Sequence, residues 1–408
     1  MSRFLYWQSL KKIILAPDAF KGTMSAVKIC SIMEGVIKRY FPDAEVLKIP
    51  LADGGEGTIE CFIQAIGGEK VELSVKGPYC EAVNAFYAVL SNGETAVVEM
   101  AQAAGLPLVG DRKNPLLTTT YGVGQLIRHA VENSCKKIII GLGGSCTNDG
   151  GVGMAAASGI RFYDSKGYVF VPTSGTLDKI ARIDTSEQMA ELDQCDIVAL
   201  TDVDNPLHGI QGAACIFGPQ KGADRNMVEV LDNNLQHLSE RIKSDLGKEV
   251  ANLPGSGAAG GMGAGVVAFF GGRLAPGIET VLDTLDFNSL LENADIILTG
   301  EGKIDKQSLR GKVIVGVARR AKLKSGRMTD HYLRNGGKRL WQRTQRKQRW
   351  RHPVPYWTLF LCRKATLAES LKRGWVWRNE NSVSAGSSTE WWQWVGSTCC
   401  ILVWCPSC

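Results

Sequence analysis

The sequence predicts an α/β protein with a largely parallel sheet. Short apolar runs typical of buried strands alternate with segments whose apolar residues recur at helical spacing. Several of these runs end in glycines and carboxylates, and open α/β sheets bind their ligands at the carboxyl ends of their strands. The 408 residues, 44% of them hydrophobic, are enough for two or three domains with cores of their own.

The predicted elements can be taken in chain order. Residues 12–16 and 44–49 indicate two short buried strands, and residues 25–40 between them carry apolar side chains at helical spacing. Ser25 stands where a helix N-cap is expected. The same criteria predict strands at 137–141, 196–200 and 294–298, and helices at 152–158 and 227–246.

Composition excludes several classes of protein. No run of about 18 apolar residues occurs, which argues against a transmembrane helix. Residues 1–10 lack the apolar core and cleavage site of a signal peptide. The 12 cysteines show neither a disulfide framework nor the His/Cys spacing of a zinc site. We therefore predict a cytoplasmic protein without a membrane partner.

The net charge of +6 comes from the last fifth of the chain. Residues 325–408 hold 14 of the 47 Lys and Arg and 4 of the 41 Asp and Glu. Residues 1–324 are left with 33 basic and 37 acidic groups and are mildly acidic. The total charge therefore does not predict a nucleic-acid partner.

Residues 325–408 also differ in composition. They contain nine of the 10 tryptophans and five of the 12 cysteines, and residues 339–351 have neither helical nor strand periodicity. One interpretation is a basic, aromatic tail that binds nucleic acid. We favour the other, translation in a shifted reading frame, because tryptophan this dense without an amphipathic pattern is atypical of a folded segment.

Two glycine-rich segments are candidates for phosphate binding. The chain has neither a P-loop motif nor a dinucleotide-binding fingerprint after its first strand. Residues 141–151 follow a predicted strand and precede a helix, so their backbone N–H groups could approach an anion; the alternative is a tight turn. Residues 255–265 could bind phosphate or let a helix pack closely on the sheet. The candidate nucleotide-binding residues are Gly143, Gly144, Ser145, Asp149, Lys221, Gly260 and Gly261.

Carboxylates supply the complementary chemistry. Acidic pairs stand among glycines or at strand ends in residues 53–56, 202–204 and 301–305. Any one of these carboxylates alone is typical of a turn or a helix cap. Phosphoryl transfer requires Mg²⁺ held by a few carboxylates, cations on the transferred group and an acceptor for the hydroxyl proton. The combination therefore favours phosphoryl transfer.

At these segments the chain resembles the bacterial type I glycerate kinases. The resemblance covers residues 12–322 and rests on blocks in the family's order at 16–23, 52–58, 141–151, 201–207, 217–223, 258–263 and 299–305. It implies a phosphotransferase with an alcohol acceptor that uses ATP and Mg²⁺ to phosphorylate D-glycerate. The implied product is 2-phosphoglycerate, with 3-phosphoglycerate as the alternative.

The resemblance also implies two α/β domains with the site in the cleft between them. One is a Rossmann-like domain with a mostly parallel sheet built from both ends of the chain, at residues 12–70 and 290–324. The other is a glycine-rich α/β insertion at residues 71–289. We interpret residues 325–408 as an aberrant tail without a native fold, and we expect a monomer or a homodimer.

Residue chemistry suggests which groups bind glycerate. Lys21 or Arg310 could pair with its carboxylate, because a cation and a carboxylate form strong hydrogen bonds. Asp18 and Asn205, at two of the shared blocks, are further candidates for contact with the substrate.

The same reasoning assigns candidate catalytic and metal-binding groups. Asp53 or Asp202 could accept the proton of the attacking hydroxyl, and Lys21 could act beside them. Glu301 and Asp305 could hold Mg²⁺ or its waters.

The resemblance stops near Lys324 and returns briefly at residues 365–374. In the family, another apolar strand and a closing helix would follow. Loss and short recovery of similarity are typical of a shifted frame between two frame changes, so we expect poor packing after residue 324. The alternative functions are a catalytically inactive or unstable product, or a protein that binds nucleotide without turnover.

Overall fold

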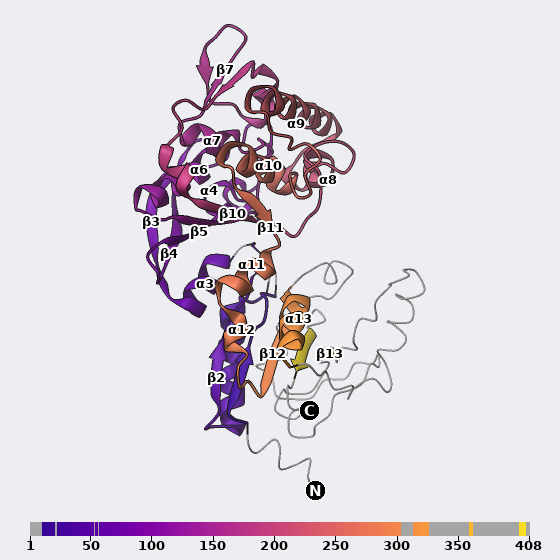
Figure 1. Ribbon diagram of the computed structural model, residues 1–408. Helices are drawn as coiled ribbons and strands as arrows, with labels where there is room; N and C mark the ends of the chain where they lie inside the picture. The colour runs from indigo at the N-terminus through magenta and orange to yellow at the C-terminus, as the bar shows by residue number, and fades with distance from the viewer. Residues whose placement is uncertain are drawn as a thin grey trace. The chain divides into compact units, whose positions relative to one another are not determined.

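A computed structural model describes residues 10–20, 23–52, 54–55, 57–302, 313–325, 359–361 and 400–404. The chain forms two compact units (Figure 1). Unit 1 comprises Met1–Ala52 and Val281–Cys408, and unit 2 comprises Asp53–Thr280. These limits differ from the sequence-based ones at 70/71 and 289/290, because α3 (Thr58–Ile66) packs on the sheet of unit 2 and α12 (Phe287–Leu290) packs on α13 (Val313–Ser325).

Unit 1 contains a sheet in the order β13-β14-β12-β1-β2. Strand β1 lies between β2 and β12 and is parallel to both, whereas β14 is antiparallel to β12 and β13 is antiparallel to β14. The strands are β1 (Lys12–Leu15), β2 (Glu45–Lys48), β12 (Ile296–Glu301), β13 (Leu359–Leu361) and β14 (Cys400–Trp404).

Helix α2 (Ala26–Tyr40) connects β1 to β2 and packs Ile29, Met33 and Ile37 into the core of unit 1. Ser25 caps it as predicted, since its side chain accepts a hydrogen bond of 3.3 Å from the backbone N–H of Lys28. The periodicity therefore located this helix to within one residue.

Strand β12 differs from the sequence expectation, which ended the strand at residue 298. The strand continues to Glu301, because residues Thr299, Gly300 and Glu301 pair in antiparallel register with β14. Glu301 is therefore the last residue of a strand and is buried there.

Unit 2 contains a six-stranded sheet in the order β11-β10-β6-β5-β4-β3, whose first four strands are parallel. Every residue of β5 is buried, as are four of the five residues of β6 and of β10, as expected for strands with both faces covered. The strands are β3 (Gly68–Lys76), β4 (Ala82–Leu90), β5 (Thr95–Glu99), β6 (Lys137–Gly141), β10 (Asp196–Leu200) and β11 (Arg273–Ala275).

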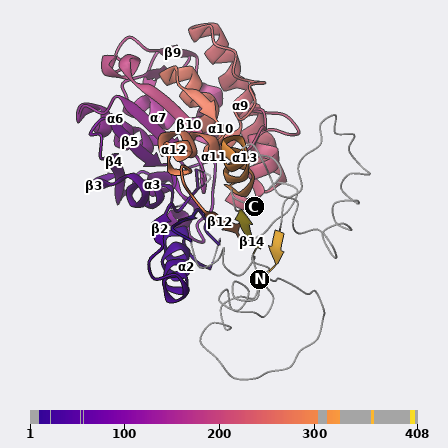
Figure 2. The same ribbon diagram turned by 60° about the horizontal axis from the view of Figure 1, so that its bottom comes forward.

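Helices surround this sheet, and their apolar side chains join those of the strands in one core (Figures 1 and 2). The longest begins at Arg225, two residues before its predicted start, because Asp224 caps it by accepting a hydrogen bond from the N–H of Met227. The helices are α4 (Ala101–Ala104), α5 (Leu106–Val109), α6 (Tyr121–Glu132), α7 (Val152–Ala157), α8 (Ala213–Phe217), α9 (Arg225–Leu246), α10 (Ala258–Phe270) and α11 (Gly277–Thr284), the last of which reaches into unit 1.

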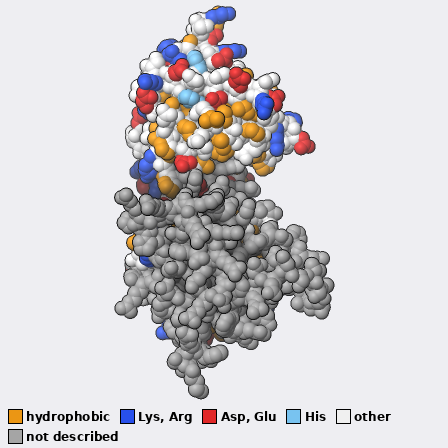
Figure 3. All heavy atoms as spheres, turned by 90° about the vertical axis from the view of Figure 1, so that its right-hand side faces the viewer, with side chains coloured by type: hydrophobic (Ala, Val, Ile, Leu, Met, Phe, Trp, Pro, Cys, Tyr) orange, Lys and Arg blue, Asp and Glu red, His pale blue; other side chains and the backbone are white. Residues whose placement is uncertain are grey.

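The surface of unit 2 carries a smaller sheet and exposed apolar groups. The small antiparallel sheet has the order β8-β7-β9, formed by β7 (Arg161–Tyr163), β8 (Val169–Phe170) and β9 (Arg182–Asp184). Figure 3 shows hydrophobic side chains gathered on one face of the unit.

None of the helices in the described residues is long and apolar enough to cross a membrane.

Candidate active site

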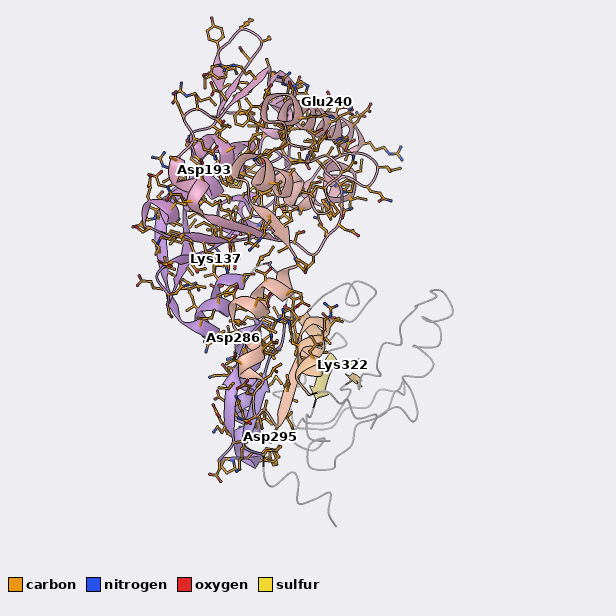
Figure 4. The ribbon with its side chains drawn as sticks, in the orientation of Figure 1. Lys137, Asp193, Glu240, Asp286, Asp295 and Lys322 are labelled. Atoms are coloured by element: carbon orange, nitrogen blue, oxygen red, sulfur yellow. The ribbon has the colours of Figure 1, made fainter. Side chains whose placement is uncertain are left out.

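Three neighbouring parallel strands of unit 2 end at the same edge of the sheet. Gly141, the last residue of β6, lies in register with Leu200 of β10 on one side and with Glu99 of β5 on the other. Lys137 marks the opposite, amino end of β6 (Figure 4). The glycine loop after β6 and the acidic segment after β10 therefore begin side by side, at the edge where α/β proteins bind ligands.

The loop after β6 lies directly against the glycines that follow residue 53. The N–H of Gly143 donates a hydrogen bond of 3.0 Å to the carbonyl oxygen of Gly54. A Cβ on Gly143 would come within 2.5 Å of the Cα of Gly55, and a Cβ on Gly141 within 2.7 Å of the Gly54 oxygen. Glycine is thus required at positions 141 and 143 for the two backbones to approach this closely.

Two predicted nucleotide-binding residues lie at the turn of the same loop. Gly144 is exposed and has a φ of 75°, a conformation that favours glycine. Ser145 follows it and is buried, with a bridge between its backbone and that of Gly105. Of this pair, Gly144 is the one that the structure leaves accessible to a ligand.

Asp149 is fully buried and its carboxylate is surrounded by donors. It accepts hydrogen bonds from the N–H of Thr120 at 2.8 Å, the Thr120 hydroxyl at 2.9 Å, and the N–H groups of Gly151 at 3.2 Å and Gly153 at 3.3 Å. Burial raises the pKa of this carboxyl above its usual range, and the hydrogen bonds oppose that shift. Asp149 thereby joins the start of α6 to the start of α7.

Lys221 is buried beside the same loop. Its Nζ donates a hydrogen bond of 2.6 Å to the carbonyl oxygen of Thr147, and its side chain is 2% exposed. Desolvation lowers the pKa of Lys221 to about 8, while the nearby Cys146 and Asp149 oppose that shift. Lys221 therefore places a buried amino group beside the loop, where its positive charge can act.

The second glycine cluster shows the close packing that was one of its two interpretations. Gly260 and Gly261 have φ values of 69° and 90°, so the helical backbone conformation of α10 is interrupted there. A Cβ on Gly260 would lie 2.0 Å from the oxygen of Thr147, and the N–H of Gly150 donates to the oxygen of Gly260 at 3.0 Å. Phosphate binding by Gly260 and Gly261 stays a prediction.

The segment after β10 presents a carboxylate to solvent. Asp202 is exposed, and its Oδ1 accepts a hydrogen bond of 3.3 Å from the N–H of Gly277. Asn205 is half-buried; its side-chain amide donates to the oxygen of Gln211 at 2.8 Å, and its own carbonyl accepts from the N–H of Gly257 at 3.0 Å. Asp202 is therefore accessible for chemistry, whereas Asn205 holds two loops together.

In unit 1, two predicted site residues lie at the carboxyl ends of adjacent parallel strands. Asp18 follows β1, and its N–H donates to the oxygen of Gly300 at 2.8 Å, one residue before Glu301 at the end of β12. The side chains of Asp18 and Glu301 are 6% and 3% exposed. Carboxylates at such a position suit Mg²⁺, although the described residues contain no cluster of three His, Cys, Asp or Glu groups able to hold a metal ion.

Four predicted site residues, Lys21, Asp53, Asp305 and Arg310, lie outside the described residues. Their predicted roles are therefore retained as predictions.

Sequence reasoning missed one residue at this sheet edge, Glu99. Its Oε1 accepts a hydrogen bond of 2.9 Å from the N–H of Ile59 in the first turn of α3, and its side chain is buried. Desolvation raises the pKa of Glu99 to about 7, and hydrogen bonds from the backbone oppose the shift. The available signal was the pattern used elsewhere, an apolar run of residues 96–98 that is followed by a carboxylate.

Most of the chain is similar in sequence to known glycerate kinases. Residues 13–329 match the model of the glycerate kinase family. The chain is 49% identical over 313 residues to glycerate kinase of Bacillus cereus, covering 76% of this chain and 82% of that protein. It is 46% identical over 312 residues to glycerate 2-kinase of Escherichia coli, with the same coverage of both chains.

The fold is also shared with a solved structure. The crystal structure of a Salmonella typhimurium LT2 protein assigned as glycerate kinase 2 superposes with a TM-score of 0.73 at 45% identity, covering 78% of this chain and 85% of that one. Given the family match over residues 13–329 and these relatives, the chain belongs to the glycerate kinase family.

Proposed function

We propose that this kinase transfers the γ-phosphoryl group of ATP to the 2-hydroxyl of D-glycerate, giving 2-phosphoglycerate and ADP. Family membership over residues 13–329 carries the proposal, and the relative from Escherichia coli is named a glycerate 2-kinase. The exposed carboxylate of Asp202, beside glycine loops at the carboxyl edge of a parallel sheet, suits this chemistry.

In the proposed reaction the glycerate hydroxyl oxygen forms a bond to the γ-phosphorus, and the bond from that phosphorus to the β–γ bridging oxygen breaks. Asp202 or Asp53 accepts the hydroxyl proton. Mg²⁺ would neutralise charge on the phosphates, with Glu301 and Asp305 as the residues that hold the ion or its waters.

The substrate-binding roles follow from charge. Lys21 or Arg310 would pair with the glycerate carboxylate, with Asp18 and Asn205 as further contacts. Among the nucleotide-binding candidates, exposed Gly144 is best placed for a phosphate contact. Lys221 and Asp149 are buried, so they would act on the nucleotide indirectly, by fixing the conformation of the loop and by their charges.

An activity assay of the full chain tests this proposal. The purified protein is incubated with ATP, Mg²⁺ and D-glycerate, and the product is identified by ³¹P NMR, which separates 2-phosphoglycerate from 3-phosphoglycerate. Formation of 2-phosphoglycerate supports the proposal, and 3-phosphoglycerate would correct the acceptor hydroxyl. L-glycerate serves as the matched control substrate.

A second candidate function is nucleotide binding without turnover. It is favoured by the composition of residues 325–408, almost all of which lie beyond the family match. Calorimetric ATP binding without phosphorylated product would support it.

We further propose that the protein acts in the cytoplasm, as a monomer or homodimer, without a nucleic-acid partner.

A further inference from the structure

Glu99 lies at the end of β5 and reaches the start of α3. Its Oε1 accepts a hydrogen bond of 2.9 Å from the N–H of Ile59. The N-cap residue of α3, Gly57, has no side chain to cap the helix. Glu99 therefore supplies from another strand the acceptor that an N-cap side chain ordinarily supplies.

The segment that leads into α3 is held at its other end by the glycine loop. The oxygen of Gly54 accepts from the N–H of Gly143 at 3.0 Å, and the hydroxyl of Thr58 donates to the oxygen of Gly55 at 2.6 Å. A Cβ on Gly54, whose φ is 91°, would lie 2.7 Å from the Cβ of Leu200 at the end of β10. Gly54 and Ile59 thus contact the ends of the three parallel strands β5, β6 and β10.

We propose that Glu99 is a positioning residue for the kinase reaction, which fixes Gly54, Gly55 and the start of α3 at the carboxyl edge of the sheet by accepting the N–H of Ile59. The inference rests on the proposed function, because Asp53, one of the two candidate bases, directly precedes Gly54 in the sequence. Glu99 acts through the backbone of the segment.

The electrostatics of Glu99 give this role a pH dependence. Burial disfavours the ionised carboxylate and raises the pKa of Glu99 to about 7, and the hydrogen bonds from Ile59, Gln102 and Gly57 oppose the shift. Among the described residues, the charged group acting on it is Glu60 of α3, which raises the pKa further and pairs with Lys70 of β3 at 2.6 Å. The ionised carboxylate is the stronger acceptor for the Ile59 N–H, so it orients the start of α3 more precisely above pH 7, even though burial makes the folded protein less stable when this carboxylate is ionised.

The experiment compares the full-length wild type with Glu99→Gln and Glu99→Ala. Glutamine keeps an acceptor oxygen without a titratable proton, and alanine removes the acceptor. Glu94→Gln is the matched control, since Glu94 is an exposed carboxylate just before the same strand. The first measurement is kcat and KM for ATP and D-glycerate between pH 5.5 and 9. The second is hydrogen–deuterium exchange of the amides of residues 54–63.

We expect Glu99→Ala to lower kcat by about tenfold or more with a smaller change in KM, and to speed exchange at Ile59, because small displacements of catalytic segments are costly. Glu99→Gln should retain kcat within about threefold at pH 8 and lose the inflection near pH 7 on the acid side of the profile. Glu94→Gln should match the wild type in every measurement.

Two results would overturn the inference: unchanged exchange at residues 54–63 in both Glu99 variants, or an inflection that persists in Glu99→Gln. If the wild type does not phosphorylate glycerate, the proposed function fails, while the exchange experiment still decides whether Glu99 positions the segment. If Glu99→Ala does not fold, Glu99→Gln and its exchange pattern remain decisive.

Discussion

Asp202 is the exposed carboxylate that follows β10, and its Oδ1 accepts a hydrogen bond of 3.3 Å from the N–H of Gly277. An asparagine can keep this acceptor through its amide oxygen but cannot accept a proton at neutral pH. If Asp202 is the base, Asp202→Asn lowers kcat by about 100-fold or more with little change in KM. Steady-state kinetics check this, and Asp204→Asn, also exposed, is the control. Turnover near that of the wild type would assign the role to another group.

Glu99 also makes stability depend on pH. Its pKa in the folded protein, about 7, lies above the ordinary value of 4.5, so folding favours the protonated form. The stability that this group contributes is fully present below pH 4.5 and is lost as pH rises through 7. The difference amounts to at most roughly 3.5 kcal/mol, since each unit of pKa is worth about 1.4 kcal/mol.

Glu99→Gln removes this titration. We expect its free energy of unfolding, measured in urea, to rise relative to the wild type as pH increases from 4.5 to 8. A difference that stays constant with pH would show that Glu99 does not titrate in that window.

At the scale of the element, Asp149 holds the start of α6 to the start of α7 through four hydrogen bonds. Replacing the carboxylate with an amide loses acceptor capacity and places an NH₂ group against N–H donors. Asp149→Asn should therefore lower the free energy of unfolding by roughly 2–4 kcal/mol. Urea denaturation measures it. Asp178→Asn, at an exposed position, should change stability by less than about 0.5 kcal/mol.

The two glycine segments at the sheet edge give a second prediction at this scale. Alanine at Gly143 would place a Cβ 2.5 Å from the backbone of Gly55, so the segments must move apart. We expect Gly143→Ala to reduce kcat by about tenfold or more, as small displacements in an active site do. Gly35→Ala is the control, because its Cβ on α2 meets no atom within 4 Å and alanine favours a helix. Equal kcat values for the two variants would show that the close contact between Gly143 and Gly55 is not needed for catalysis.

The elements were predictable where one local signal decides them. The apolar runs of β6 and β10 gave their exact bounds, and periodicity located α2, because burial of a strand or helix face is written in residue type and spacing. The extension of β12 to Glu301 depends on pairing with residues about 100 positions further on, which no local pattern reveals. The same holds for Glu99, whose hydrogen-bond partner Ile59 lies 40 residues away, and for Asp149, whose partner Thr120 lies 29 residues away.

At the scale of the whole molecule, the chain changes character near residue 325. The family match ends at residue 329, and beyond it the chain is rich in tryptophan and basic residues. Residues 359–361 and 400–404 form strands that extend the sheet of unit 1 from β12. The prediction that the tail lacks a native fold otherwise concerns residues outside those described, so an experiment on the intact chain has to test it.

Limited proteolysis with trypsin provides that experiment. Residues 325–408 hold 14 Lys and Arg in segments without apolar periodicity, and cleavage follows local opening of the chain. We expect the first cuts to fall after residue 325, leaving a fragment that contains unit 2, where basic residues such as Arg128 and Lys137 lie in helices and strands. Mass spectrometry of the early fragments locates the cuts. A tail cleaved no faster than unit 2 would mean that residues 325–408 pack as a native part of the fold, and the interpretation of a shifted reading frame would then be abandoned.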